Sequence, residues 1–123
     1  MCLDTISTKV PKTKGLFWKV FHNIAGELHS DCVDTVPVRR RGIWLKATPN
    51  KKSYRTSDEL YTLGFHGFTT EKEARQWCRL CGNYEYANVD IIEVKYRRGH
   101  SAGTQGKLNV IVADEILIPR RKK

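Results

Sequence analysis

The stretch that decides the fold is residues 64–82, which read GFHGFTTEKEARQWCRLCG. Thr70 is a natural N-cap, because its hydroxyl can accept a hydrogen bond from an N–H of the first helical turn. Glu73 lies three residues later and completes a capping box. Apolar residues then follow at the spacing of one helical face, namely Ala74, Trp77, Cys78 and Cys81. The stretch therefore predicts a short strand followed by an α-helix over about residues 70–81.

No other part of the chain has a comparable helical pattern, so the rest is expected to form a sheet around this helix. Further strands are expected at residues 16–22, 27–32, 43–47, 89–96 and 108–118, from their aromatic, β-branched or alternating residues. The predicted fold class is α+β, a mostly antiparallel β-sheet with one main α-helix packed on it. Residues 1–123 are expected to form a single domain, with an extended N-terminal arm over residues 1–15 and a basic C-terminal tail over residues 119–123.

Two polar segments are predicted to be loops. Residues 48–58 contain a Pro-Asn turn signal among polar residues. Residues 99–106 are small or polar and include three glycines, so their backbone N–H groups are candidates for holding an anion.

The two cysteines of the helix form a CxxC motif, Cys78-Arg79-Leu80-Cys81. Such a motif occurs in metal sites and redox pairs. A zinc site needs two more ligands, and no second compact pair lies at a zinc-finger spacing. Both sulfurs fall on the apolar stripe, where free cysteine behaves as a small buried residue. The main hypothesis is a core role with no metal and no cofactor, and a metal site at Cys78 and Cys81 is the alternative.

The chain carries a formal net charge of +9, which favours phosphate-bearing or acidic partners. No apolar run approaches the length of a membrane helix, and the N-terminus lacks the apolar segment of a signal peptide, so a cytosolic protein is expected. The alternative for the charge is a solvated basic surface without a partner. The residues expected to contact a partner are Arg39, Arg40, Arg41, Arg97, Arg98 and His66.

Two adjacent acids, Asp114 and Glu115, interrupt the otherwise apolar last strand. Alternation sends them to opposite faces of the sheet, so at most one points into the core. A buried carboxylate needs a partner, and Arg97, Arg98 or a histidine can supply it. The alternatives are a structural ion pair or a functional carboxylate.

Several short motifs occur together in this chain: the MCLDT start, the Trp18–Phe21 strand with its Gly-Glu-Leu-His-Ser return, GFHGF at 64–68, GTQG at 103–106 and VADE at 112–115. In this order they resemble small proteins encoded by bacteriophages and prophages, over most of the chain. The resemblance implies a phage accessory protein in the host bacterial cytoplasm. The arginine run and the basic tail depart from that pattern, which suggests a partner particular to this chain.

A second resemblance is to the ADP-ribosyltransferase fold. His22 ends an early strand, residues 64–78 look like that fold's strand-then-helix segment, and Glu115 precedes Ile-Leu-Ile-Pro. The resemblance implies that His22 and Glu115 hold NAD and act on its ribose. Asn23 stands where the family has Gly-Thr or Gly-Ser, and the Ser-Thr-Ser motif is absent from the sequence.

Three functional hypotheses follow. The first is a non-enzymatic phage inhibitor or sequestering protein, which counters a bacterial defence by binding a host protein or its nucleotide or nucleic-acid ligand through a basic surface. The second is direct nucleic-acid binding, with Trp44, Tyr54 and Tyr61 as stacking groups. The third is the transferase, with His22 and Glu115 in its site.

Overall fold

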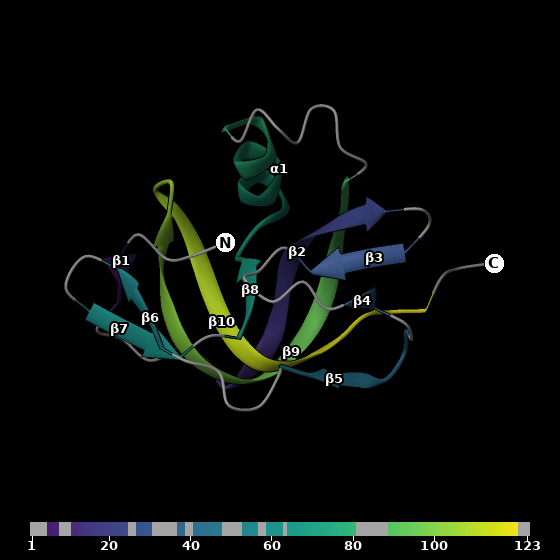
Figure 1. The fold of residues 1–123 in the computed structure, drawn as a ribbon, viewed down its shortest axis with the longest axis horizontal. Coiled ribbons are helices and arrows are strands. Elements are labelled where there is room, and N and C mark those ends of the chain that lie inside the picture. Colours follow the sequence, from purple (N-terminus) through teal and green to yellow (C-terminus); the bar gives the residue numbers. More distant parts are fainter. Residues whose placement is uncertain are drawn as a thin grey trace.

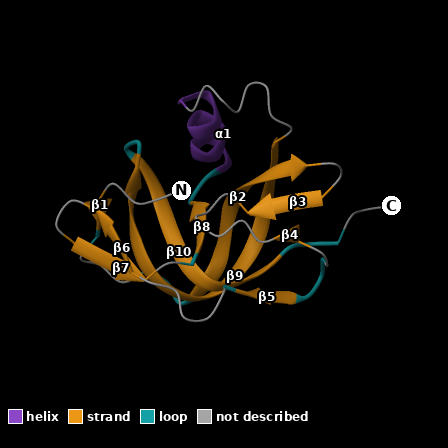
Figure 2. Ribbon diagram, in the orientation of Figure 1, coloured by secondary structure: helices purple, strands orange, loops and turns teal. Residues whose placement is uncertain are grey.

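The computed structural model describes residues 5–7, 11–24, 27–30, 37–38, 41–47, 53–56, 59–62, 64–80 and 89–120 (Figures 1 and 2). The elements in chain order are β1 (Thr5–Ile6), β2 (Lys14–Ile24), β3 (Glu27–Ser30), β4 (Pro37–Val38), β5 (Trp44–Lys46), β6 (Ser53–Thr56), β7 (Glu59–Thr62), β8 (Phe65–Phe68), α1 (Glu71–Leu80), β9 (Val89–Gln105) and β10 (Leu108–Leu117). The described part is mainly β, with one short helix, and every strand pairing is antiparallel.

Four strands of the large sheet pair in a closed ring. β9 pairs with both β2 and β10, β10 also pairs with β8, and Trp18 of β2 lies opposite Phe68 of β8. β1, β3, β4 and β5 extend this ring at its edges, whereas β6 and β7 form a separate two-stranded sheet. Figure 1 shows that β9 and β10 are long and strongly curved, with α1 across one end of the molecule.

The core follows from alternation along these strands. In β9, Val94 and Tyr96 are buried while Glu93 and Lys95 are exposed, which confirms the alternation predicted from the sequence. Two groups of buried side chains form the core. The first includes Ala74 of the helix with Val20, Phe68, Leu108 and Val110, and the second includes Phe17, Phe21, Phe65, Tyr96 and Ile116.

The helix confirms the expected boundary and cap. The Glu73 backbone N–H donates to the Thr70 hydroxyl at 3.2 Å, so Thr70 is the N-cap. The Glu73 carboxylate accepts from the Thr69 and Thr70 hydroxyls, at 2.6 and 3.0 Å. It also accepts from the backbone N–H of Asn109 in β10, at 2.6 Å. Glu73 therefore ties the first turn of α1 to the sheet as well as capping it.

The helix packs through the predicted stripe. Ala74 is fully buried, and Trp77 and Cys78 pack against the core while partly exposed. Among the described residues, no group of cysteine, histidine and carboxylate side chains is arranged to hold a metal ion. Cys81 lies outside the described residues.

Gly67 allows β8 to lie against an aromatic ring. A Cβ at this position would lie 2.2 Å from Cγ of Phe17, well inside van der Waals contact. The ring of Phe17 is fully buried and stacks on Tyr96, with ring centroids 4.9 Å apart. The Gly between two buried residues, His66 and Phe68, is therefore a packing requirement.

The prediction of a loop over residues 99–106 is wrong. β9 continues to Gln105, and the connection to β10 is a two-residue turn of Gly106 and Lys107, with φ of 57° and 67°. Positive φ at both central residues is the signature of a type I′ hairpin turn. The small residues before the turn are strand residues that pair with β10 and, at Gly103 and Thr104, with β1.

The prediction of a loop over residues 48–58 is also wrong in its second half. Residues 53–56 form β6, which pairs with β7 so that Tyr54 lies opposite Tyr61. At the N-terminus, the expected arm contains β1, and Lys14 already begins β2. The sequence did not predict these short strands, because their residues are mostly polar. Each strand is held by backbone pairing with a neighbouring strand.

Candidate functional site: a basic groove

Glu115 is a buried carboxylate on the outer face of the sheet, and two arginines hold it. Its side chain is 3% exposed. Arg97 Nη2 donates to Glu115 Oε1 at 2.8 Å, and Arg98 Nε lies 3.1 Å from Oε2. This confirms the expectation that an arginine would be the partner of whichever acid, Asp114 or Glu115, is buried. Asp114 lies on the other side, half-exposed, with His100 Nε2 3.2 Å from its Oδ1.

The backbone of β9 explains how two consecutive arginines reach one carboxylate. In a regular strand Arg97 and Arg98 would point to opposite faces. Arg98 instead has a φ of 58°, a left-handed conformation that is uncommon outside glycine. Close by, the register shifts so that Ser101 pairs with Val112 but Gly99 pairs with Ala113, leaving His100 as a bulge. The irregularity re-aims Arg98 toward Glu115.

The charges around Glu115 keep it ionised. The hydrogen bond from Arg97 is the main cause that lowers the pKa of Glu115 below its ordinary value. Burial opposes this effect, and the positive charges of Arg97, Arg98 and Lys46 add to the lowering. One carboxylate thus sits among three cations, so the site keeps an excess of positive charge.

Strand register places more cations on the same face. Lys14 lies opposite Arg97 on β2, and Lys46 lies opposite Glu115 on β5. Two positions further along β9, Lys95 lies between Leu16 of β2 and Leu117 of β10. The sheet therefore presents rows of basic and apolar side chains running across four strands.

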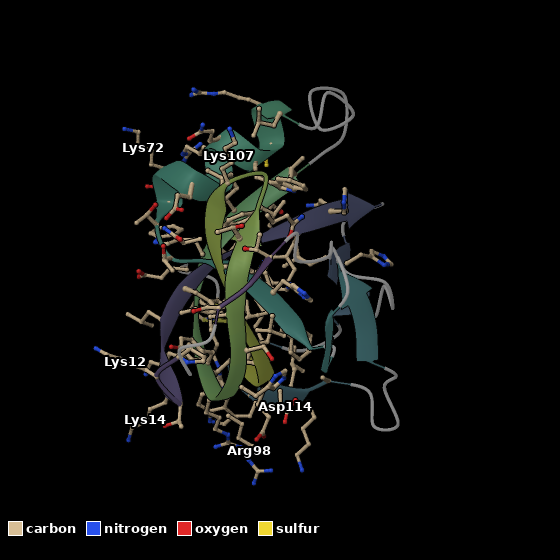
Figure 3. The ribbon with its side chains drawn as sticks, turned by 90° about the vertical axis from the view of Figure 1, so that its left-hand side faces the viewer. Lys12, Lys14, Lys72, Arg98, Lys107 and Asp114 are labelled. Atoms are coloured by element: carbon tan, nitrogen blue, oxygen red, sulfur yellow. The ribbon has the colours of Figure 1, made fainter. Side chains whose placement is uncertain are left out.

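These side chains line an open cavity of about 680 Å³, which we call the basic groove. It is lined by Lys14, Gly15, Leu16, Trp44, Lys95, Tyr96 and Arg97. Leu16 is 54% exposed, unusually for a leucine beside so many charges. Figure 3 shows Lys14 and Arg98 at one end of the molecule, with Lys72 and Lys107 at the opposite end.

Trp44 and Arg97 form a stacked pair within the groove. The Arg97 guanidinium carbon lies 4.2 Å from the centroid of the Trp44 ring, which is a cation–π contact. Glu115 holds one edge of the Arg97 guanidinium, while the Arg97 side chain stays 43% exposed. A fixed, partly exposed guanidinium on an aromatic ring suits phosphate oxygens or the flat face of a base.

The structure brings together only part of the predicted contact set. Arg97 and Arg98 meet at Glu115, whereas Arg39 and Arg40 lie outside the described residues. Arg41 is partly buried.

His66 does not lie on the surface. It is fully buried, with its Nδ1 3.0 Å from the Gly64 carbonyl oxygen. Its backbone carbonyl accepts from the buried Lys19 Nζ at 3.0 Å. His66 therefore belongs to the core and is not available to a partner.

The transferase pair is not brought together. His22 lies opposite Val89 at the start of β9, whereas Glu115 lies opposite Arg97, eight positions later along the same strand. This separation is about 26 Å of extended strand. Glu115 is also occupied by two arginines, so it does not form a site with His22.

Sequence reasoning missed Lys14, Leu16 and Lys95 as groove residues. The alternation of Lys95 and Arg97 on one face of β9 was visible in the sequence. What makes them a site is the order β2–β9–β10–β5, which short strands of similar composition do not reveal. Tyr54 and Tyr61, the other expected stacking residues, have side chains outside the described part.

Comparisons with protein-family models, with curated proteins and with solved structures gave no significant match to this chain. In the part of the chain that the structure describes, no helix has the length and apolar character needed to cross a membrane.

Proposed function

We propose that this protein is a non-enzymatic, phage-encoded accessory protein that binds a phosphate-bearing ligand through the basic groove. The observation that carries the proposal is the Trp44–Arg97 stack, which Glu115 fixes and Lys14 and Lys95 flank. The motif resemblance to phage proteins supports a setting in the host bacterial cytoplasm. There, sequestering a nucleotide or a nucleic acid would counter a host defence that depends on it.

The groove favours ligand binding over catalysis. Its carboxylate is buried, ionised and paired with two arginines, so it has no free proton to donate and no open approach for a substrate. The charged side chains that line the groove, Lys14, Lys95 and Arg97, are cations, which attract phosphate but do not act as bases while protonated.

The test is a titration with two phosphate-bearing probes, ATP and a labelled single-stranded oligothymidylate, followed by fluorescence anisotropy and calorimetry. We expect binding that weakens as salt is added, because cations that neutralise phosphates release counterions. The variant Lys95→Gln removes one exposed cation from the lining of the groove. We expect it to lower affinity by roughly tenfold, as for loss of a charge-assisted hydrogen bond.

The matched control is Lys72→Gln with Lys107→Gln, which removes two exposed cations at the far end of the molecule (Figure 3). This control should bind nearly as well as the parent protein at moderate salt. Failure of both probes to bind, or equal losses in the control and in Lys95→Gln, would contradict the proposal.

The second candidate is direct binding of single-stranded nucleic acid, which the exposed Leu16 and the Trp44 ring favour. Stacking of a base on an aromatic side chain contributes about 1–3 kcal/mol. In this case the oligothymidylate should bind much more tightly than ATP, and Trp44→Ala should lower its affinity about tenfold. Equal affinity for the two probes would favour a nucleotide ligand instead.

A further inference from the structure

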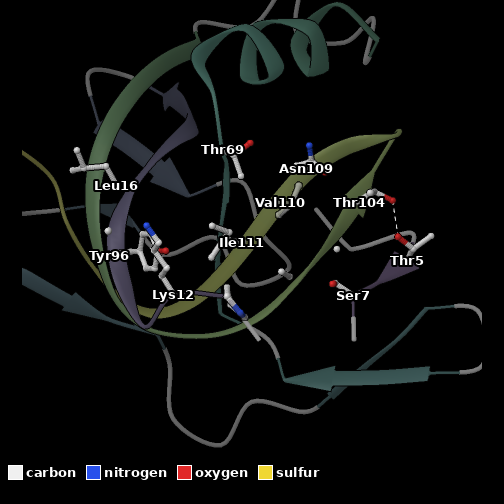
Figure 4. A pocket seen from close by; sticks show the side chains of 14 residues that line it. Thr5, Ser7, Lys12, Leu16, Thr69, Tyr96, Thr104, Asn109, Val110 and Ile111 are labelled. Atoms are coloured by element: carbon white, nitrogen blue, oxygen red, sulfur yellow. Dashed lines mark hydrogen bonds between the residues drawn. The ribbon is translucent and has the colours of Figure 1, made fainter. Parts of the chain in front are cut away.

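A second cavity lies within the curve of the sheet and shares Gly15, Leu16 and Tyr96 with the lining of the basic groove. Its volume is about 670 Å³, within the range of small-molecule sites. Figure 4 shows Tyr96, Ile111, Val110 and Thr104 around the hollow that the arc of β9 and β10 encloses. The complete lining is Thr5, Ser7, Pro11, Lys12, Gly15, Leu16, Thr69, Tyr96, Ala102, Gly103, Thr104, Asn109, Val110 and Ile111.

Tyr96 is the unusual member of this lining. It is 3% exposed, and its ring stacks on Phe17. It crosses over Gly15, its partner on β2, where a Cβ would lie 3.2 Å from the Tyr96 hydroxyl oxygen. In the part of the chain that the structure describes, this hydroxyl makes no hydrogen bond, and its oxygen is not one of the fully buried polar atoms that lack a partner, so it remains open to the cavity. Burial also raises the pKa of Tyr96, so at neutral pH it is a donor.

The rest of the lining defines the chemistry that would complete this site. Val110 and Ile111 give apolar walls, and the Thr5 and Thr104 hydroxyls, bonded to each other at 2.7 Å, give a polar rim. The lining contains one cation, Lys12, and no carboxylate. An apolar body therefore fits the walls, and a negative group fits beside Lys12.

We propose that this cavity is a second binding site, for a small organic anion whose apolar body lies on Val110 and Ile111. Its anionic group lies at Lys12, and an acceptor on the ligand takes the hydrogen bond of the Tyr96 hydroxyl. A carboxylate or a phosphate monoester supplies the same charge at Lys12. This site differs from the basic groove in having one cation, Lys12, in place of Lys14, Lys95 and Arg97.

The experiment uses the full chain and three probes of one shape, 2-naphthoate, 2-naphthyl phosphate and the neutral 2-naphthol, with binding measured by calorimetry and by two-dimensional NMR. At least one of the two anions should bind. Its affinity should be at least about tenfold higher than that of the neutral probe, because hydrogen bonds to charged groups contribute more to binding than neutral ones. Whichever of the two anions binds more tightly identifies the anionic group as carboxylate or phosphate. Binding of neither anion would overturn the proposal.

The deciding variant is Tyr96→Phe. Because the hydroxyl makes no hydrogen bond to the described residues, the melting temperature should stay unchanged, while affinity for the bound probe falls roughly tenfold. Lys12→Gln should cause a similar loss. The control Lys95→Gln changes the basic groove alone and should leave probe binding unchanged. Full affinity in both Tyr96→Phe and Lys12→Gln would overturn this site. Lys12 lines this cavity and not the basic groove, whereas Tyr96 lines both, so the comparison of Lys12→Gln with Lys95→Gln separates the two sites.

Discussion

At the scale of single residues, Gly67 shows how little space the core leaves beside Phe17. We predict that Gly67→Ala lowers the free energy of unfolding by about 1–3 kcal/mol, because the added methyl overpacks a buried ring. Denaturant unfolding measures this loss. Gly15→Ala is the matched control, since its added methyl would lie 3.2 Å from the Tyr96 ring rather than 2.2 Å from Phe17. An equal loss in both variants would contradict this account of the core.

Glu115 gives a prediction about pH. Its pKa is lowered in the folded protein by the Arg97 hydrogen bond, whereas in the unfolded chain it titrates near its ordinary value of about 4.3. Between these two values the unfolded state binds the proton more readily than the folded state. The stabilisation from Glu115 is therefore complete above about pH 4.5 and is lost as the pH falls through the folded pKa.

Thermal unfolding measured from pH 7 to pH 3 checks this prediction. The parent protein should lose stability steeply below about pH 4.5. Glu115→Gln should be less stable at pH 7, because two arginines lose their anionic partner, and its acid slope should be shallower. Parallel pH curves for the parent and the variant would show that Glu115 is not the titrating group.

At the scale of elements, the helix depends on one side chain for its attachment to the sheet. Glu73 accepts hydrogen bonds from two threonine hydroxyls and from the backbone of Asn109. Burial raises the pKa of Glu73, but these hydrogen bonds outweigh that effect and lower it overall. We predict that Glu73→Ala lowers the free energy of unfolding by about 1–3 kcal/mol.

Glu71→Ala is the matched control, because it removes a neighbouring acid from the same first turn. Glu71 makes an exposed ion pair with Arg75 at 2.9 Å. Such pairs on a helix contribute about 0.3–0.5 kcal/mol. Denaturant unfolding of both variants separates the tie to β10 from the general effect of negative charge at a helix start. A larger loss in Glu71→Ala would contradict the attachment.

The elements also show what sequence patterns can and cannot predict. The helix over residues 71–80 was predictable because cap, charge and apolar period agree within one local segment. The second half of β9 was not, because its glycines and small polar residues resemble a loop. That half is a strand because β1 and β10 pair with it, and such long-range pairing leaves little local pattern.

At the scale of the whole molecule, the fold gathers charges that are scattered in sequence. Lys14, Trp44, Lys95 and Arg97 come from three strands, and only the strand order places them around one groove. The partnership of Glu115 with Arg97 and Arg98 was predictable, because a buried acid requires a cation. The conformation of Arg98 was not, since positive φ at an arginine depends on its tertiary surroundings.

The whole-molecule charge gives a further prediction about salt. If the groove alone holds the phosphates, the slope of log affinity against log salt should fall by about one unit for each groove cation removed. Lys14→Gln with Lys95→Gln should therefore reduce the slope by about two units. The slope comes from oligothymidylate titrations at several salt concentrations. An unchanged slope would mean that phosphates contact the protein elsewhere, despite its net charge of +9.

The most direct measurement is NMR mapping of the oligothymidylate complex. The account predicts the largest shift changes at the Trp44 indole N–H and at the amides of Lys14, Leu16, Lys95 and Arg97. Small changes are expected in α1 and at the Gly106–Lys107 turn. If the largest changes fall on α1 or on that turn while the groove signals stay still, the basic groove is not the binding site.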